Sequence, residues 1–111
     1  MNAVSEPTPV DVSLFEENGR YQFRSQDGMA LYRYDRDRPE TSNCRAACTA
    51  LWPPFMASAG ASPVVGNWKA IPRSPARQWT YHGAPVYTYA KDVPGGPSGD
   101  GIDGTWHVLL P

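Results

Sequence analysis

One segment with two tyrosines and an aspartate occurs twice in this chain. The first copy, residues 28–37, reads Gly-Met-Ala-Leu-Tyr-Arg-Tyr-Asp-Arg-Asp, and the second, residues 83–92, reads Gly-Ala-Pro-Val-Tyr-Thr-Tyr-Ala-Lys-Asp. A tryptophan follows each copy, Trp52 after the first and Trp106 after the second. Two halves that each lack a complete core can bury their apolar faces against one another. The repeat therefore predicts one pseudo-symmetric domain, with repeat 1 at about residues 20–55 and repeat 2 at about residues 77–110.

The composition limits what these repeats can form. The chain has 111 residues, which fits one domain, and its 12 prolines and 10 glycines disfavour long helices. Aromatic residues alternate with polar ones at 20–24 and recur at 78–81, which is typical of half-buried strands. We expect hairpins at 20–35 and 78–89 and a last strand at 105–110. The predicted fold class is mainly β, a small single domain of short antiparallel strands at 14–111 after a flexible lead-in at 1–13.

One short helix is expected near residues 43–51. Ser42 or Asn43 can cap its start, because their side-chain oxygens accept hydrogen bonds from the first turn. The alanine-rich stretch that follows favours helix, and Pro53 and Pro54 must end it. The residues at 56–67 are small and are expected to form a loop.

The tyrosines of each copy lie two positions apart, so on a strand they point to the same face. Such pairs could form a stacking platform for a sugar or a flat cofactor, but we favour packing within the sheet. The aspartate of each copy comes just after the strand, where a carboxylate most often fixes a turn by accepting backbone N–H bonds. The motif and structural residues are thus Tyr32, Tyr34, Asp37, Trp52, Pro53, Pro54, Tyr87, Tyr89, Asp92 and Trp106.

Cys44 and Cys48 are separated by three residues, which is one residue too many for a thioredoxin-like pair or a haem c attachment. Zinc would need two more ligands, and His82 and His107 are the only histidines. We favour a structural disulfide, with free thiols or metal and redox use as the alternatives. On a regular helix the two Cβ atoms would be too far apart, so the bond requires an irregular turn.

A glycine-rich loop near the C-terminal end carries Asp92, Asp100 and Asp103, whose oxygens could bind Ca²⁺. Their spacing does not match an EF-hand, so these aspartates, with His82 and His107, are weak metal candidates. The sequence contains no known catalytic or phosphate-binding motif. We therefore expect a protein that is not an enzyme and that has no cofactor.

Charge and hydropathy narrow the possible partners. The formal net charge is −1 and the sequence pI is about 6.0, so no basic surface for nucleic acid is expected. No run of apolar residues is long enough for a transmembrane segment. Residues 1–7 have neither the cationic start nor the apolar core of a signal peptide, so we expect that any signal segment is not present in this chain.

The ordered combination of these motifs resembles one bacterial family. Gly-x-x-Leu-Tyr-x-Tyr-x-x-Asp, Ser-x-Cys-x-x-x-Cys-x-x-x-Trp-Pro-Pro and Gly-x-Pro-Val-Tyr-x-Tyr-x-x-Asp, followed by a glycine-rich stretch ending in tryptophan, resemble the predicted lipoproteins with a Yx(FWY)xxD motif. This family is also called the secreted repeat of unknown function. The resemblance implies an extracytoplasmic protein, periplasmic or secreted, often lipid-anchored and with no established activity. No lipidated cysteine lies near residue 1, although an unprocessed form could carry one.

We therefore expect an extracytoplasmic accessory or interaction module without enzymatic activity, whose partner is a protein or another component of the cell envelope. One alternative is an envelope protein that binds a metal or a redox cofactor. Another is a glycan-binding module that uses exposed tyrosine or tryptophan rings.

Overall fold

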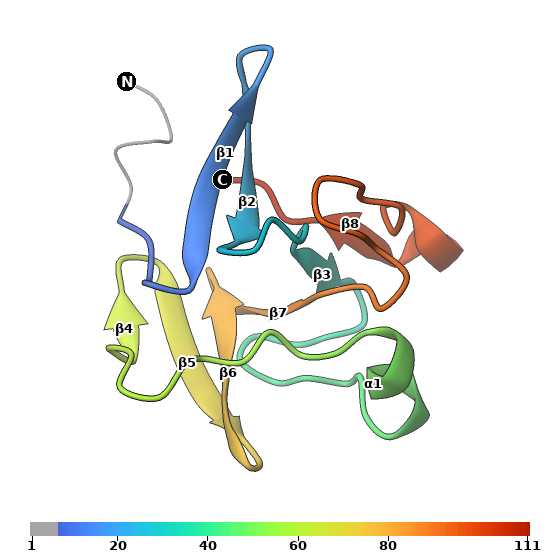
Figure 1. Ribbon diagram of the computed structural model, residues 1–111. Coiled ribbons are helices and arrows are strands. Elements are labelled where there is room, and N and C mark those ends of the chain that lie inside the picture. The colour runs from blue at the N-terminus through green and yellow to red at the C-terminus, as the bar shows by residue number, and fades with distance from the viewer. Residues whose placement is uncertain (1–6) are drawn as a thin grey trace.

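The computed structural model describes residues 7–111 and confirms a mainly β fold with one short helix (Figure 1). In chain order its elements are β1 (Val12–Glu17), β2 (Arg20–Ser25), β3 (Tyr32–Tyr34), α1 (Ala47–Leu51), β4 (Val64–Val65), β5 (Trp68–Arg73), β6 (Ala76–Tyr81), β7 (Ala84–Tyr87), the 3₁₀ helix η2 (Ile102–Gly104) and β8 (Trp106–Val108). Strands β1 and β2 form a two-stranded sheet, and the other strands form a six-stranded sheet in the order β4-β5-β6-β7-β3-β8. All strand pairs are antiparallel.

The two copies of the repeated segment meet at the centre of the larger sheet. Strand β3 of the first copy pairs with β7 of the second, and Tyr32 lies opposite Tyr87 in this pairing. On its other side β3 pairs with β8, which places Tyr34 opposite Trp106. Corresponding residues of the two repeats therefore face one another, as expected for a pseudo-symmetric domain.

The hairpin expected at 20–35 is wrong. Strand β2 pairs along its whole length with β1, and a single bridge, Arg24 to Ala30, joins it to the segment before β3. Asn18 and Gly19 both have positive φ, 55° and 78°, which is the conformation that a two-residue hairpin turn requires. This turn favours the β1–β2 hairpin, while β3 is already paired on both sides by β7 and β8.

The second expected hairpin is confirmed. Strands β6 and β7 pair through Thr80 with Pro85 and Tyr81 with Ala84, around a turn that contains Gly83. The rest of this half differs from the expectation, because β5 and the short β4 form a ladder with β6 that the sequence analysis did not predict. The last strand, β8, is shorter than expected and ends at Val108.

Helix α1 begins at Ala47, four residues later than expected, and ends at Leu51 before the two prolines. Neither Ser42 nor Asn43 caps it; its N-cap is Ala46, which has φ 53° and no side-chain cap bond. The segment before the helix is held in a non-helical conformation by two hydrogen bonds of Asn43. Its N–H donates to the Asp37 carboxylate, and its side-chain amide donates to the Arg36 carbonyl. No helix in the described part of the chain has the length and apolar character needed to cross a membrane.

Part of the expected lead-in belongs to the folded domain. Residues 1–6 lie outside the described part of the chain, whereas Pro9 and Val12 are buried. Strand β1 starts at Val12, two residues before the expected start of order at Leu14. Asp11 fixes this segment to the body, since its Oδ2 accepts hydrogen bonds from the Ser58 N–H and the Trp79 indole, both at 2.9 Å.

The core consists of two clusters of buried side chains. The first lies between the two hairpins and contains Val12, Phe23, Leu31, Trp68, Ala70, Trp79, Tyr81, Val86 and Leu109. The second lies beside the β3–β7 pair and contains Ala30, Tyr32, Cys44, Trp52, Tyr87, Tyr89 and Trp106. Most of the aromatic residues that the repeat predicted are in this second cluster, so the repeated motif builds the interior of the fold.

Candidate functional site

The side chains of the repeated motif form one cluster, which we call the motif cluster. It is defined as Tyr32, Tyr34, Asp37, Trp52, Tyr87, Tyr89, Asp92 and Trp106. In it the tyrosine of each repeat binds the aspartate of the other repeat. The Tyr32 hydroxyl donates to Asp92 Oδ2 at 2.6 Å, and the Tyr87 hydroxyl donates to Asp37 Oδ2 at 2.7 Å. These two bonds cross the β3–β7 pair in opposite directions and join the repeats.

The second carboxylate oxygen of each aspartate fixes a turn in its own repeat. Asp37 Oδ1 accepts a hydrogen bond from the Asn43 N–H at 2.6 Å. Asp92 Oδ1 accepts from the Ser98 N–H at 2.7 Å and from the Ser98 hydroxyl at 2.8 Å. Asn43 and Ser98 occupy equivalent positions after the aspartates. Each aspartate thus anchors both a loop of its own repeat and a tyrosine of the other.

Four aromatic rings of the motif cluster form a continuous stack. Trp52 and Trp106 lie at its centre with ring centroids 3.9 Å apart and planes inclined by 2°. Tyr34 stacks on Trp106 at 4.1 Å, and Tyr89 stacks on Trp52 at 4.3 Å. Each tyrosine therefore stacks on the tryptophan that follows the other copy of the motif. Aromatic stacking stabilises a core beyond the area it buries.

Burial keeps the two bonded hydroxyls protonated. It raises the pKa of Tyr32 far above its ordinary value, and the hydrogen bond to Asp92 adds to this effect. The pKa of Tyr87 is likewise raised, first by burial and then by its bond to Asp37. Burial also raises the pKa of Asp37, against the hydrogen bonds from Asn43 and Tyr87. The arrangement favours phenols that donate permanently to carboxylates, which suits a structural connection.

The rings of the motif cluster have little surface on which a ligand could stack. Tyr32 and Tyr87 are 0% exposed, and Trp52, Tyr89 and Trp106 are buried as well. Tyr34 is half-buried, and one face of its ring is covered by Trp106. The chemistry available to this cluster is therefore packing and hydrogen bonding between the repeats.

A disulfide joins Cys44 and Cys48, as the sequence predicted, with their Cα atoms 5.3 Å apart. It closes an irregular turn, because Cys44 lies before the helix and Ala46 between the cysteines has a positive φ. Arg73 from β5 binds the same loop, donating to the Cys44 carbonyl at 2.7 Å and to the Ser42 hydroxyl at 2.6 Å.

The sequence analysis missed the polar residues that surround Tyr87. Ser42 lies 2.5 Å from the Tyr87 hydroxyl, and Arg73 donates to both Ser42 and Gln78. Gln78 is fully buried and donates to the Val86 carbonyl. Only the position of the glutamine directly before Trp79, in a strand expected to be half-buried, could have marked it as a buried hydrogen-bonding residue.

The weak metal candidates are separate from one another. Asp92 is occupied by Tyr32 and Ser98, and Asp100 accepts a hydrogen bond from the Val108 N–H at 2.9 Å. The remaining three have other surroundings: His107 pairs with Asp35 at 2.7 Å, His82 packs edge-on against Tyr81, and Asp103 is exposed within η2. Within residues 7–111 no three histidine, cysteine, aspartate or glutamate side chains are grouped so that they could hold a metal ion.

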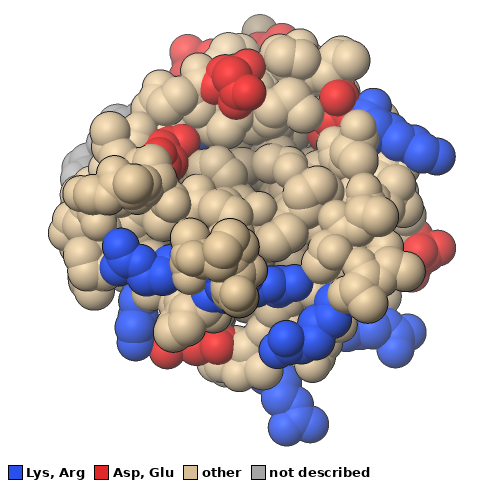
Figure 2. Space-filling model, turned by 60° about the horizontal axis from the view of Figure 1, so that its bottom comes forward, with Lys and Arg blue, Asp and Glu red and all other residues tan. Residues whose placement is uncertain are grey.

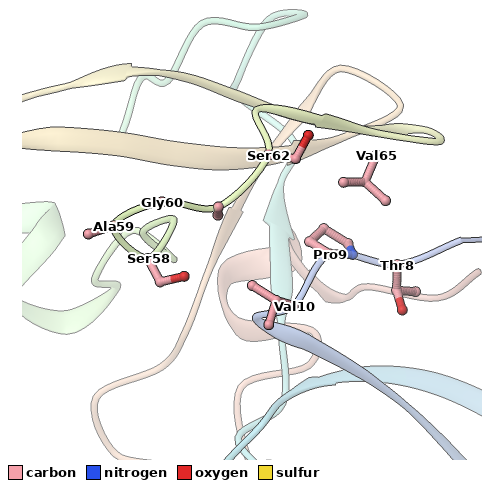
Figure 3. A pocket seen from close by; sticks show the side chains of 9 residues that line it. Thr8, Pro9, Val10, Ser58, Ala59, Gly60, Ser62 and Val65 are labelled. Carbon is pink, nitrogen blue, oxygen red and sulfur yellow. The ribbon is translucent and has the colours of Figure 1, made fainter.

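Among the depressions of the surface are two that lie away from the motif cluster. A pocket of about 460 Å³ lies between the segment before β1 and the loop at 58–62, and small apolar and hydroxyl side chains line it (Figure 3). A larger open groove of about 1090 Å³ lies beside the β1–β2 hairpin. We call it the hairpin groove; its lining residues are Phe15, Glu17, Asn18, Arg20, Tyr21, Gln22, Arg24, Gly95, Pro97, Asp100, Val108, Leu110 and Pro111.

Charged side chains of both signs are distributed around the face drawn in Figure 2. Its central hollow is uncharged, while basic side chains gather toward the lower rim and acidic ones toward the upper rim. Neither sign covers this face, in keeping with the formal net charge of −1.

The comparisons with known proteins agree with the two-repeat architecture. A family described as a secreted repeat of unknown function matches residues 17–56 and, separately, residues 76–110. These two regions correspond to the two halves that exchange tyrosine–aspartate bonds. Neither a curated protein nor a solved structure matches the chain.

Proposed function

The chain belongs to the family of secreted repeats of unknown function, and from this premise we propose that it is a non-enzymatic interaction module that binds a protein partner outside the cytoplasm. The disulfide between Cys44 and Cys48 supports this location, because disulfides persist in oxidising compartments. A lipid anchor on an unprocessed form would hold the module at the cell envelope.

One observation carries the proposal: the motif side chains are directed inward, whereas exposed apolar side chains border the hairpin groove. Phe15 is 37% exposed and Leu110 is 58% exposed, and both line this groove. Apolar residues around an open groove, rimmed by charged ones, are typical of protein-binding surfaces. The two repeats therefore supply a rigid body, and the hairpin groove supplies the contact.

Site-specific photo-crosslinking in the organism that makes the protein tests this function. A photoreactive residue at position 15 should capture one defined protein, and the same residue at position 64 should not, since Val64 is exposed but lies away from the groove. The captured protein, once purified, should bind the isolated module in a calorimetric titration. Capture of no protein at either position, or turnover of a substrate by the purified chain, would contradict the proposal.

A further inference from the structure

The backbone pairing along equivalent strand edges differs between the two repeats. In the second half, a segment that follows the two prolines lies along the side of β6 that faces away from β5, where it also pairs with β7. The Trp79 N–H donates to the Phe55 carbonyl at 2.9 Å, and the Ala57 N–H donates to the Arg77 carbonyl at 2.8 Å. Met56 and Gln78 form an antiparallel bridge between them. The edge of β6 is thus completed by a short strand from the other repeat.

Within residues 7–111 the equivalent edge of β2 is paired only near its C-terminal end, through the Arg24–Ala30 bridge. Glu17 and Arg20 flank a two-residue turn, so their backbones hydrogen-bond to each other. The direction of the backbone N–H and C=O groups alternates along the strand, so those of Tyr21 and Phe23 point away from β1. By the repeat, residues 109–111 correspond to 55–57. No backbone hydrogen bond joins residues 21–23 to 109–111 in the described structure, and Pro111 lacks the N–H with which Ala57 pairs.

The hairpin groove occupies the place of the missing strand. Tyr21 from β2 lines one wall, and Val108, Leu110 and Pro111 from the C-terminal segment line the other. Figure 1 shows this segment running from β8 toward the β1–β2 hairpin. Natural proteins cover or protect such open edges, because unpaired backbone groups pair readily with another strand.

The charges in the groove are balanced, with two arginines against two acidic residues. Arg20 and Arg24 come from β2, Glu17 from β1 and Asp100 from the loop before η2. Arg24 stacks over the Phe15 ring at 3.7 Å, so its guanidinium also covers apolar surface. The groove therefore favours an occupant recognised through its backbone and apolar side chains.

We propose that the hairpin groove binds an extended peptide segment of the partner protein, which adds to β2 as an antiparallel strand. The proposal rests on the interaction function given above and names its binding mode. The segment at 55–57 is the template: an apolar residue whose carbonyl accepts from the strand, then a backbone donor two positions later. In strand addition the backbone bonds supply affinity, and pockets for alternate side chains supply specificity.

A peptide copied from the template tests this mode. The probe is a capped peptide with the sequence of residues 53–59, titrated into isotope-labelled protein and followed by NMR. We expect shifts at Tyr21 and Leu110, which line the groove, and slower exchange of the Tyr21 amide. The control peptide carries Ala57→Pro, which removes the donor that should pair with Tyr21, and it should bind about tenfold more weakly or worse.

Two protein variants of matched exposure locate the site. Leu110→Asp places a charge in the groove and should weaken binding, whereas Val64→Asp, at a residue 59% exposed, should leave it unchanged. Shifts confined to other surfaces, no shifts, or equal binding of the proline peptide would overturn strand addition. A crosslinked partner that still binds Leu110→Asp at full affinity would overturn the groove proposal and leave the interaction function standing.

Discussion

The Tyr32 hydroxyl lies 2.6 Å from Asp92 Oδ2, so a tyrosine of the first repeat donates its hydrogen bond to a carboxylate of the second. The same relation holds in reverse between Tyr87 and Asp37, at 2.7 Å. Because both tyrosines are fully buried, each bond lies where water cannot replace it. The pair of bonds ties the two halves together at the centre of the sheet.

Replacing Tyr32 by phenylalanine should lower the free energy of unfolding by about 1–3 kcal/mol. The substitution removes a buried donor and leaves both Asp92 Oδ2 and the Gly99 N–H, which donates to the Tyr32 hydroxyl at 3.0 Å, without that partner. Urea unfolding followed by fluorescence measures the change. Tyr21→Phe serves as the control, because this half-buried tyrosine should lose little; equal effects of the two variants would contradict the structural role of the bond.

Truncating Trp106 to alanine should cost about 3–5 kcal/mol, since it removes a large buried ring from the middle of the four-ring stack. Near-ultraviolet circular dichroism should lose the signal of the coupled indoles at the same time. Leu51→Ala, at an exposed position, should change stability by less than about 0.5 kcal/mol. If Trp106→Ala proves too unstable to fold, Trp106→Phe should fold and show a smaller loss in the same direction.

Removing the disulfide with the double substitution Cys44→Ala and Cys48→Ala should destabilise the domain by about 2 kcal/mol, because the closed loop is very short. Thermal unfolding with and without a reducing agent measures this effect. Reduction should lower the melting temperature of the natural chain and leave that of the double variant unchanged. A reductant effect of equal size on both proteins would show that the bond is not its origin.

Two half-buried carboxyls should give pH dependences of opposite sign. Burial would raise the pKa of Asp11, but the hydrogen bonds from Ser58 and Trp79 outweigh it and lower the pKa below 3.8. Its stabilising contribution is therefore present above pH 3.8 and is lost as the pH falls through the lowered folded-state value. Burial raises the pKa of Asp37 above 3.8, so its contribution is full below pH 3.8 and is lost as the pH rises through the raised value.

Urea unfolding across the acid range separates these contributions with Asp11→Asn and Asp37→Asn. The stability of the natural chain minus that of Asp11→Asn should increase with pH, and the corresponding difference for Asp37→Asn should decrease. Parallel slopes in the two comparisons would contradict the assigned environments.

The mainly β architecture with two repeats could be predicted from the sequence, because the repeat and the turn residues are local signals. The β6–β7 hairpin followed from its aromatic strands and the glycine between them. The disulfide followed from a pair of cysteines, Cys44 and Cys48, whose spacing fits neither a haem c attachment nor a thioredoxin-like site. The hairpin expected at 20–35 was wrong because Asn18 and Gly19 form the tighter turn and pair β2 with β1 instead.

The connections of the motif cluster could not be obtained from the sequence in the same way. Nothing local indicates that Tyr32 binds the aspartate of the other repeat, because that choice depends on β3 pairing with β7. The same holds for the Trp52–Trp106 stack and for the reach of Arg73 to the Cys44 carbonyl. These contacts join residues that are distant in the chain, and only the folded arrangement specifies them.

The exchange of tyrosines and aspartates between the repeats also bears on how such a fold can arise. A chain with one copy would carry a tyrosine without its carboxylate and a carboxylate without its tyrosine. It could complete both only by associating with a second identical chain about a two-fold axis. Fusion of two such subunits would keep every contact within a single polypeptide and leave each half free to diverge, as the strand that covers β6 and the open edge of β2 have done.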